Sequence, residues 1–218
     1  MNVSDIKIEL KVKVLIYIFL FFCFFPYFQF IDLQTDSQPY ALLFSILLYP
    51  ILFEKRMKID FVLLLSCFIL SVGVLFFRNV DLGAIKSLIN YLSLFSISYI
   101  SYRCLNKTDG LSFDFYRKVV FIWFAVGFIQ LFIMPSFLSA FIPRGDNALL
   151  LKTGRGVVGL APEPTFYGIV SVFLMYIGYL NFEKEKRLKP IILLLLVQLL
   201  VLSRSSMVIF ILIISFCR

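Results

Sequence analysis

The sequence predicts an all-α fold, a polytopic transmembrane helical bundle of about eight spans with a cytoplasmic N-terminus. Three observations predict it. Of the 218 residues, 61% are hydrophobic and only 16% are charged, whereas soluble domains average about 25% charged residues. The apolar residues gather in runs, and several approach the roughly 20 residues that cross a bilayer. The Lys and Arg residues cluster between these runs.

Eight apolar runs are expected to form the helices of a single transmembrane domain over residues 1–218. Strict alternation of apolar and polar residues is absent from the sequence, which argues against a transmembrane barrel. The second, seventh and eighth runs are short for a span, and prolines bound the second. The expected spans are 14–31, 40–53, 59–77, 82–102, 119–142, 166–182, 190–203 and 206–217.

The basic residues give the expected orientation. With the N-terminus inside the cell, fifteen of the 21 Lys and Arg residues fall on inner segments and five on outer segments, while Lys86 lies within a span. Cytoplasmic segments of membrane proteins carry such an excess. The bias favours eight spans with both ends inside.

Each end of the chain carries an expectation of its own. Lys7, Lys11 and Lys13 precede the first apolar run as in a signal peptide, but FFCFFPYFQF offers no small-residue cleavage site. We therefore expect an uncleaved first span. The last run, 206–217, has only 12 residues, which reach about 18 Å as a helix. We expect the chain to be the N-terminal part of a longer fold, with a C-terminal half-helix as the alternative.

The composition excludes several kinds of chemistry. The chain contains no His, which removes a His-based triad and the usual His-containing metal sites. Its four Cys form no CxxC pair, so neither a disulfide framework nor a zinc or other metal site is expected. A net charge of +8 can indicate nucleic acid, but these cations lie where membrane topology places them. Nucleotide-binding motifs are also absent.

The longest connection between spans is the outer loop 143–165, within PRGDNALLLKTGRGVVGLAPEPTFYG. The loop carries three cations, Arg144, Lys152 and Arg155, on the outer side of the membrane, where positive charge is disfavoured. Arginine can bind phosphate through two parallel hydrogen bonds. Gly156 allows close backbone approach to a ligand. The pattern favours a site for a dianion, although three cations in a loop of this length also fit ordinary scatter.

Glu163 lies between two prolines where the next helix is expected to begin. Two interpretations stay open. The carboxylate could favour the positive end of the helix dipole, or it could act as a general base toward an acceptor hydroxyl. Tyr167 could stabilise the start of the helix or bind a polar ligand.

A second polar cluster, VLSRSSMV, interrupts the last apolar stretch. In an unbroken helix Arg204 would lie near the bilayer centre, at a cost of at least about 2.5 kcal/mol. A break at 203–206 would bring it to the outer surface or into a wet cavity. We expect Arg204, with Ser203 and Ser205, to contact substrate; an interfacial anchor is the alternative.

These two strings resemble the O-antigen polymerase family (Wzy-type), which belongs with the O-antigen ligases and related polysaccharide polymerases. RGVVGLAPEPTFYG in an outer loop, followed one span later by LSRSS, carries the resemblance, mainly over 155–206. Residues 1–140 are similar to the family only in hydropathy. Members are usually longer and have a large second outer loop.

The resemblance implies a glycosyltransferase. Members join oligosaccharide repeat units carried on polyprenyl diphosphate, at the outer face of the cytoplasmic (inner) membrane, without a nucleotide or other cofactor. A flippase and a chain-length regulator are implied partners beside the bilayer, and nucleic acid is not. Arg155 and Arg204 would stabilise the leaving diphosphate, and Glu163 would serve as base. Further substrate contacts are expected from Arg144, Lys152, Gly156, Tyr167, Ser203 and Ser205.

Other functions stay open at this point. An O-antigen ligase would hand the glycan to another acceptor, but such ligases use a His in a later outer loop. A transporter or flippase would show helix breaks at matching positions in two halves, and 203–206 has no counterpart in the first half. A scaffold without chemistry gains nothing from the outer Arg–Gly–Glu–Pro cluster. Whether this chain is active alone or an inactive fragment is open too, as is the product: O-antigen, capsule or exopolysaccharide.

Overall fold

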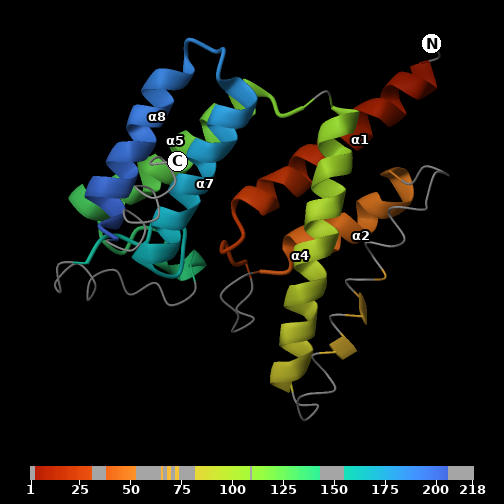
Figure 1. Cartoon of the computed structure of the whole chain (residues 1–218), viewed down its shortest axis with the longest axis horizontal. Coiled ribbons are helices and arrows are strands. Elements are labelled where there is room, and N and C mark those ends of the chain that lie inside the picture. The colour runs from red at the N-terminus through yellow and green to blue at the C-terminus, as the bar shows by residue number, and fades with distance from the viewer. Residues whose placement is uncertain are drawn as a thin grey trace. The chain divides into compact units, whose positions relative to one another are not determined.

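The computed structural model describes residues 3–30, 38–52, 65, 68–69, 72–73, 82–108, 110–142 and 155–205. All regular structure in these residues is helical, with six α-helices, one short 3₁₀ turn and one π-helix (Figure 1). The all-α prediction is therefore confirmed for the described part of the chain. The chain divides into two compact units. The first comprises Met1–Pro26 and Pro39–Gly110, and the second comprises Tyr27–Gln38 and Leu111–Arg218.

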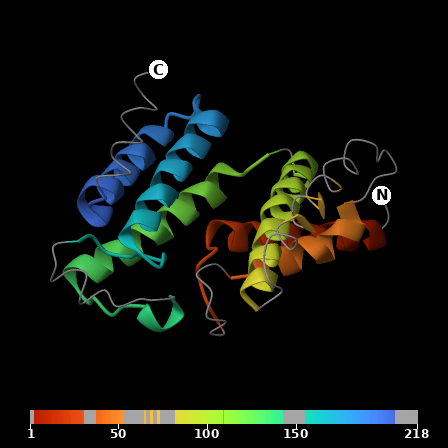
Figure 2. The ribbon, with the colours of Figure 1, turned by 60° about the horizontal axis from the view of Figure 1, so that its bottom comes forward.

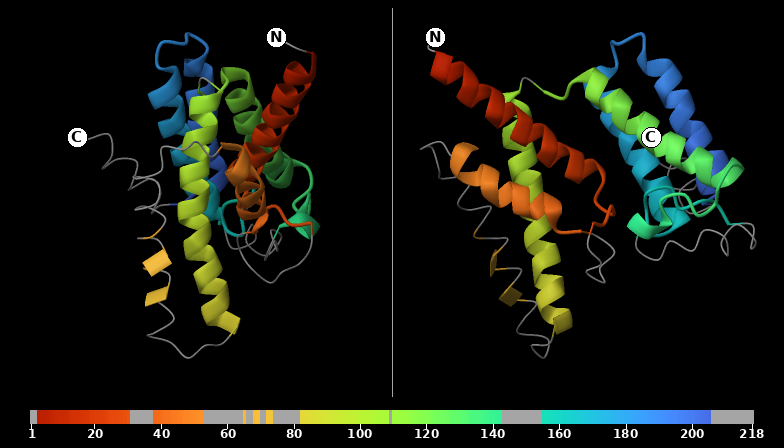
Figure 3. Two further views of the ribbon diagram at one scale, coloured as in Figure 1. Left: turned by 90° about the vertical axis from the view of Figure 1, so that its right-hand side faces the viewer. Right: turned by 180° about the vertical axis from the view of Figure 1, so that it is seen from behind.

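The described residues of the first unit form three α-helices: α1 (Val3–Phe24), α2 (Tyr40–Leu52) and α4 (Leu82–Lys107). Figure 3 shows α1 and α2 packed against α4. The Phe22 ring on α1 lies 5.3 Å from the rings of Tyr40 and Phe44 on α2. Between α2 and α4, the hydroxyls of Ser45 and Ser96 lie 2.8 Å apart. Aromatic packing and small polar contacts thus join these helices.

The second unit carries both motifs of the sequence. Its described elements are α5 (Phe113–Phe132), the 3₁₀ turn η1 (Ser139–Phe141), α7 (Pro164–Phe182), α8 (Leu188–Val197) and the π-helix η2 (Gln198–Ser203). Figure 2 shows α5, α7 and α8 running side by side. Trp123 and Tyr116 of α5 are fully buried between them with Leu174 and Leu195. The Tyr116 hydroxyl donates to the Leu174 carbonyl of α7 at 2.8 Å, tying the two helices together.

Helix bounds agree with several expected spans and differ clearly at two, since α1 begins at Val3 where the expected span begins at 14, and α5 differs at both ends. Instead of 119–142, α5 covers Phe113–Phe132. The segment FDFYRK starts the helix early because its charged side chains are exposed at the surface while Tyr116 is buried. The helix ends early because Pro135 disfavours helical backbone at the residue before it. Hydropathy follows the apolar run across this break and so misplaces both ends.

The ends of the other helices follow simple local rules. α1 ends at Phe24, before Pro26, where the expected span continued to residue 31. α7 begins with Pro164 in its first turn, a position where proline's missing N–H is harmless. The expected span 206–217 lies outside the described residues, and only scattered residues of 59–77 are described.

In the part of the chain that the structure describes, two helices, α5 and α7, are long and apolar enough to cross a membrane. Shorter apolar helices cover Val12–Phe24, Tyr40–Leu52 and Leu188–Ser203. Phe121 of α5 and Phe173 of α7 are about 60% exposed, and large exposed apolar surfaces are characteristic of interaction with another apolar phase. The eight spans, the cytoplasmic N-terminus and the single domain stay predictions.

Candidate functional site

The two motifs of the sequence meet in the second unit. Residues 155–161, here called the glycine loop, run against the end of η2. The Val157 N–H donates to the Leu202 carbonyl at 2.8 Å. A Cβ built on Gly156 would overlap the backbone oxygens of Leu202 and Ser203. Only glycine permits this approach, so Gly156 is needed for a contact with the chain's own backbone. Its expected contact with a ligand stays a prediction.

The LSRSS segment ends its helix in an unusual way. α8 widens at Gln198 into the π-helix η2, which stops at Ser203. Arg204 then adopts the left-handed conformation, with φ 48° and ψ 30°. This conformation costs a non-glycine residue roughly 1–2 kcal/mol, and helices usually place glycine there. The expected break at 203–206 is thus present as a helix end at Ser203.

Gln130 of α5 holds the glycine loop from the opposite side. Its amide is fully buried and bonds both backbone groups of Gly159. The Gly159 N–H donates to Gln130 Oε1 at 2.8 Å, and Gln130 Nε2 donates to the Gly159 carbonyl at 2.9 Å. The same Nε2 donates to the Phe137 carbonyl at 2.9 Å. One side chain therefore fixes both the loop and the turn that follows α5.

The buried ring of Tyr167 packs against the glycine loop at Gly159. Its side chain is completely buried, its ring stacks on Trp123 at 5.8 Å, and its hydroxyl donates to the Trp123 carbonyl at 3.0 Å. A Cβ on Gly127 would overlap the Tyr167 hydroxyl, and Gly159, at φ +62°, has no room for a Cβ against the same ring. The geometry gives Tyr167 a packing role, and its expected contact with substrate stays a prediction.

Arg155 and Arg204 flank the point where the two segments touch. Arg155 precedes Gly156, and Arg204 follows Ser203, so each Cα is one step of about 3.8 Å from a residue in that contact. Both side chains are exposed. Arg204 Nε donates to the Val201 carbonyl at 3.1 Å. Within the described residues, the guanidinium of Arg155 and the terminal amino groups of Arg204 have no partner, so both can bind an anion.

Glu163 occupies the N-cap position of α7 in an extended conformation. Its carbonyl accepts the Tyr167 N–H at 3.1 Å. Its half-buried carboxylate forms no capping hydrogen bond and has no other partner in the described part of the chain. A carboxylate that does not cap its own helix is free to accept a proton from a bound hydroxyl.

The remaining expected residues divide into three groups. Arg144 and Lys152 lie outside the described residues. Ser203 is buried, and its hydroxyl donates to the Leu199 carbonyl at 2.8 Å, closing the π-helix on itself. Ser205 is only 9% exposed beside Arg204. Among the described residues, no cluster of three or more His, Cys, Asp or Glu could hold a metal ion.

Sequence reasoning did not single out Gln130 or Gln198, which organise the site. Gln198 starts the π-helix, is fully buried, and its Nε2 donates to the Ser171 hydroxyl of α7 at 2.7 Å. Its Oε1 is buried without a hydrogen-bond partner. The available signal was a lone amide within a long apolar run, since polar residues in such helices usually face a neighbouring helix.

Comparison with known protein families, curated proteins and solved structures finds no match to this chain.

Proposed function

We propose that this protein polymerises polyprenyl-diphosphate-linked oligosaccharide repeat units at the outer face of the cytoplasmic membrane. One observation carries the proposal. Two segments about 45 residues apart, each singled out for its resemblance to the polymerase family, touch through Gly156 and Leu202–Ser203. An exposed arginine flanks the contact on each segment. A loop that served only as a connector would not require this approach.

The proposed reaction assigns each charged group one task. A hydroxyl of the acceptor unit attacks the anomeric carbon that joins the growing glycan to its lipid diphosphate. A new glycosidic C–O bond forms, the bond to the diphosphate oxygen breaks, and the diphosphate leaves with the bonding electrons. Arg155 and Arg204 stabilise the charge that develops on it. Glu163 accepts the hydroxyl proton and later releases it to solvent.

Membrane placement follows from the same proposal. The apolar helices α5 and α7 would cross the bilayer, with the glycine loop and Arg204 at the outer face. The loop between α7 and α8 would then face the cytoplasm, in agreement with its four Lys and Arg residues. A lipid-linked substrate in the outer leaflet would reach the arginines without leaving the membrane.

A gel of surface polysaccharide tests the proposal. In a strain lacking the gene, the ladder of long chains should collapse to single repeat units, and the wild-type gene should restore it. An unchanged ladder would refute the polymerase. Full-length glycan that is made but not attached to its final acceptor would indicate the ligase reaction instead.

The arginines provide a sharper version of this experiment. Arg155→Ala and Arg155→Lys should both lower polymer yield by about 100-fold, because lysine keeps the charge but not the two-bond contact with phosphate. Arg117→Lys is the matched control, since Arg117 is exposed and, within the described residues, pairs only with Asp114 on its own helix. Full activity of both Arg155 variants would remove Arg155 from the mechanism.

A second candidate, a transporter of the lipid-linked unit, rests on the π-helix and left-handed Arg204. Interrupted helices are frequent at transporter binding sites, where two related halves each carry one. A transporter mutant would accumulate its substrate on the inner leaflet. A polymerase mutant would still deliver single units to the cell surface, and the same gel detects them.

A further inference from the structure

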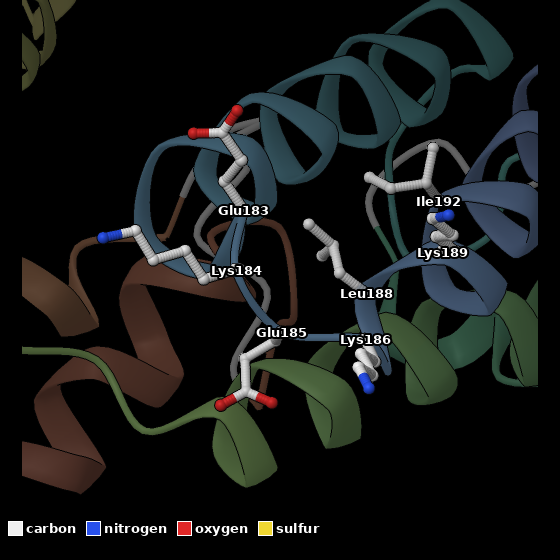
Figure 4. A pocket seen from close by; sticks show the side chains of 7 residues that line it. All are labelled: Glu183, Lys184, Glu185, Lys186, Leu188, Lys189 and Ile192. Atoms are coloured by element: carbon white, nitrogen blue, oxygen red, sulfur yellow. The ribbon is translucent and has the colours of Figure 1, made fainter.

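The turn between α7 and α8 forms a pocket with charged walls and an apolar floor. Its volume is about 340 Å³, and it is separate from the glycine loop. In the view of Figure 4, Leu188 lies between two carboxylates on one side and Lys186 and Lys189 on the other. The lining residues are Glu183, Lys184, Glu185, Lys186, Leu188, Lys189 and Ile192.

The charged side chains around this pocket do not pair with one another within the described residues. All five lining charges are exposed, and none forms an ion pair or side-chain hydrogen bond within the described residues. With Arg187, the turn carries four cations against two carboxylates, which leaves a net charge of +2. The lysines of the pocket are therefore free to bind an anionic group.

The floor of the pocket continues onto apolar surface. Leu188 is buried and Ile192 half-buried, and the neighbouring Leu193 on α8 is 63% exposed. A small soluble anion would gain nothing from such a floor, whereas an acyl chain could lie along it. Tyr176 and Tyr179, three residues apart near the end of α7, are about 60% exposed. Exposed tyrosines at a helix end are typical of the membrane–water interface.

We propose that this pocket binds the headgroup of an anionic phospholipid of the inner leaflet. Lys186 and Lys189 contact the phosphate, and an acyl chain lies along Ile192 and Leu193. Clusters of four or more cations next to an apolar helix recognise anionic lipids in this way. The inference rests on the membrane placement in the proposed function and is independent of the glycosyl transfer.

The test uses the full chain reconstituted in vesicles of phosphatidylcholine with or without phosphatidylglycerol, followed by native mass spectrometry of the retained lipids. The wild type should retain phosphatidylglycerol in preference to phosphatidylcholine. Lys186→Gln with Lys189→Gln should reduce this preference roughly 5-fold for each lysine removed. Lys186→Arg with Lys189→Arg should keep it.

Lys107→Gln with Lys118→Gln is the matched control. It removes two exposed cations from the other large segment of the same expected face, and neither of them lines the pocket. An equal loss in the control would reduce the effect to general surface charge and overturn the site. Displacement of the lipid by inorganic phosphate would also overturn it, in favour of a soluble anion.

A separate measurement distinguishes the lipid site from the proposed function. Extraction of the vesicles at alkaline pH shows whether the chain is integrated in the bilayer. A chain that is extracted overturns both the membrane placement and the lipid site. An integrated chain with no lipid preference overturns the site alone.

Discussion

The two units use buried polar side chains differently. In the unit of α1, α2 and α4, Ser45 meets Ser96 side chain to side chain. In the unit of α5, α7 and α8, Gln198 also meets Ser171 side chain to side chain, but Gln130 bonds backbone groups of the glycine loop and of the turn that follows α5. A contact between side chains holds two helices together, whereas a bond to backbone fixes the course of an irregular segment. The comparison teaches that the second unit is built to hold a loop and a helix end in place.

Gly156→Ala should cause the largest loss of stability. The new methyl group meets backbone oxygens of Leu202 and Ser203, which cannot rotate away as a side chain could. We expect a loss of about 3 kcal/mol in the free energy of unfolding, measured by denaturation in detergent micelles. Gly73→Ala in the first unit is the control, since its Cβ meets none of the described residues within 4 Å. Equal stability of the two variants would show that the contact of Gly156 with Leu202 and Ser203 does not require glycine.

Gln130→Leu should follow, with a loss of about 2 kcal/mol. The substitution leaves the Gly159 N–H and carbonyl without their partner in a buried position. Hydrogen exchange at the Gly159 amide should rise together with the loss of stability. Gln29→Leu is the matched control, because the Gln29 side chain is half-buried and forms no hydrogen bond in the described part of the chain. A variant as stable as this control would show that the loop is held by packing alone.

Tyr116→Phe tests the bond between α5 and α7 with the smallest change of shape. Removing the hydroxyl takes one hydrogen bond from the Leu174 carbonyl, which keeps its place in the α7 helix, and we expect a loss of about 1 kcal/mol in the same denaturation measurement. Tyr176→Phe should have no effect, since that side chain is about 60% exposed. A loss of similar size in both variants would argue against a specific role for the Tyr116 bond.

Ser45→Ala should have the smallest effect, about 0.6 kcal/mol, the average for polar contacts between helices in a membrane. Its hydroxyl also donates to the Leu42 carbonyl of its own helix, so part of the bonding is local. Ser93→Ala removes only a bond within one helix, from Ser93 to the Ile89 carbonyl, and serves as control. If Ser45→Ala destabilised as much as Gln130→Leu, the contrast between the units would fail.

Local chemistry made parts of this structure predictable. The start of α7 follows from Pro164, and a helix over 190–203 follows from its apolar run. The expected ends of α5 were wrong because hydropathy describes side chains and carries no information about backbone conformation. Pro135 ends the helix, although the residues after it are still apolar. A proline therefore predicts where a helix begins or ends, even where the residues on both sides of it are apolar.

The candidate site was predicted as residues and not as an arrangement. Arg155, Gly156, Glu163 and Arg204 stood out by composition, since cations and glycines are rare in apolar surroundings. That Gly156 touches Leu202–Ser203 depends on the packing of α7 against η2, which no local pattern encodes. Gln130 was missed for the same reason: its partners lie up to 29 residues away in the chain.

The π-helix at Gln198–Ser203 gives the protein a particular response to changes in length. Each residue of an α-helix turns the chain by about 100°, and a π-turn takes one residue more than an α-turn. Deleting one residue within Gln198–Ser203 would therefore let the wide turn close to an ordinary α-turn, while Arg204 keeps nearly the same direction. Deleting a second residue, with no wide turn left to close, would turn Arg204 by about 100°, away from its direction beside the glycine loop. In related sequences, the spacing between Gln198 and Arg204 should therefore vary by one residue at most.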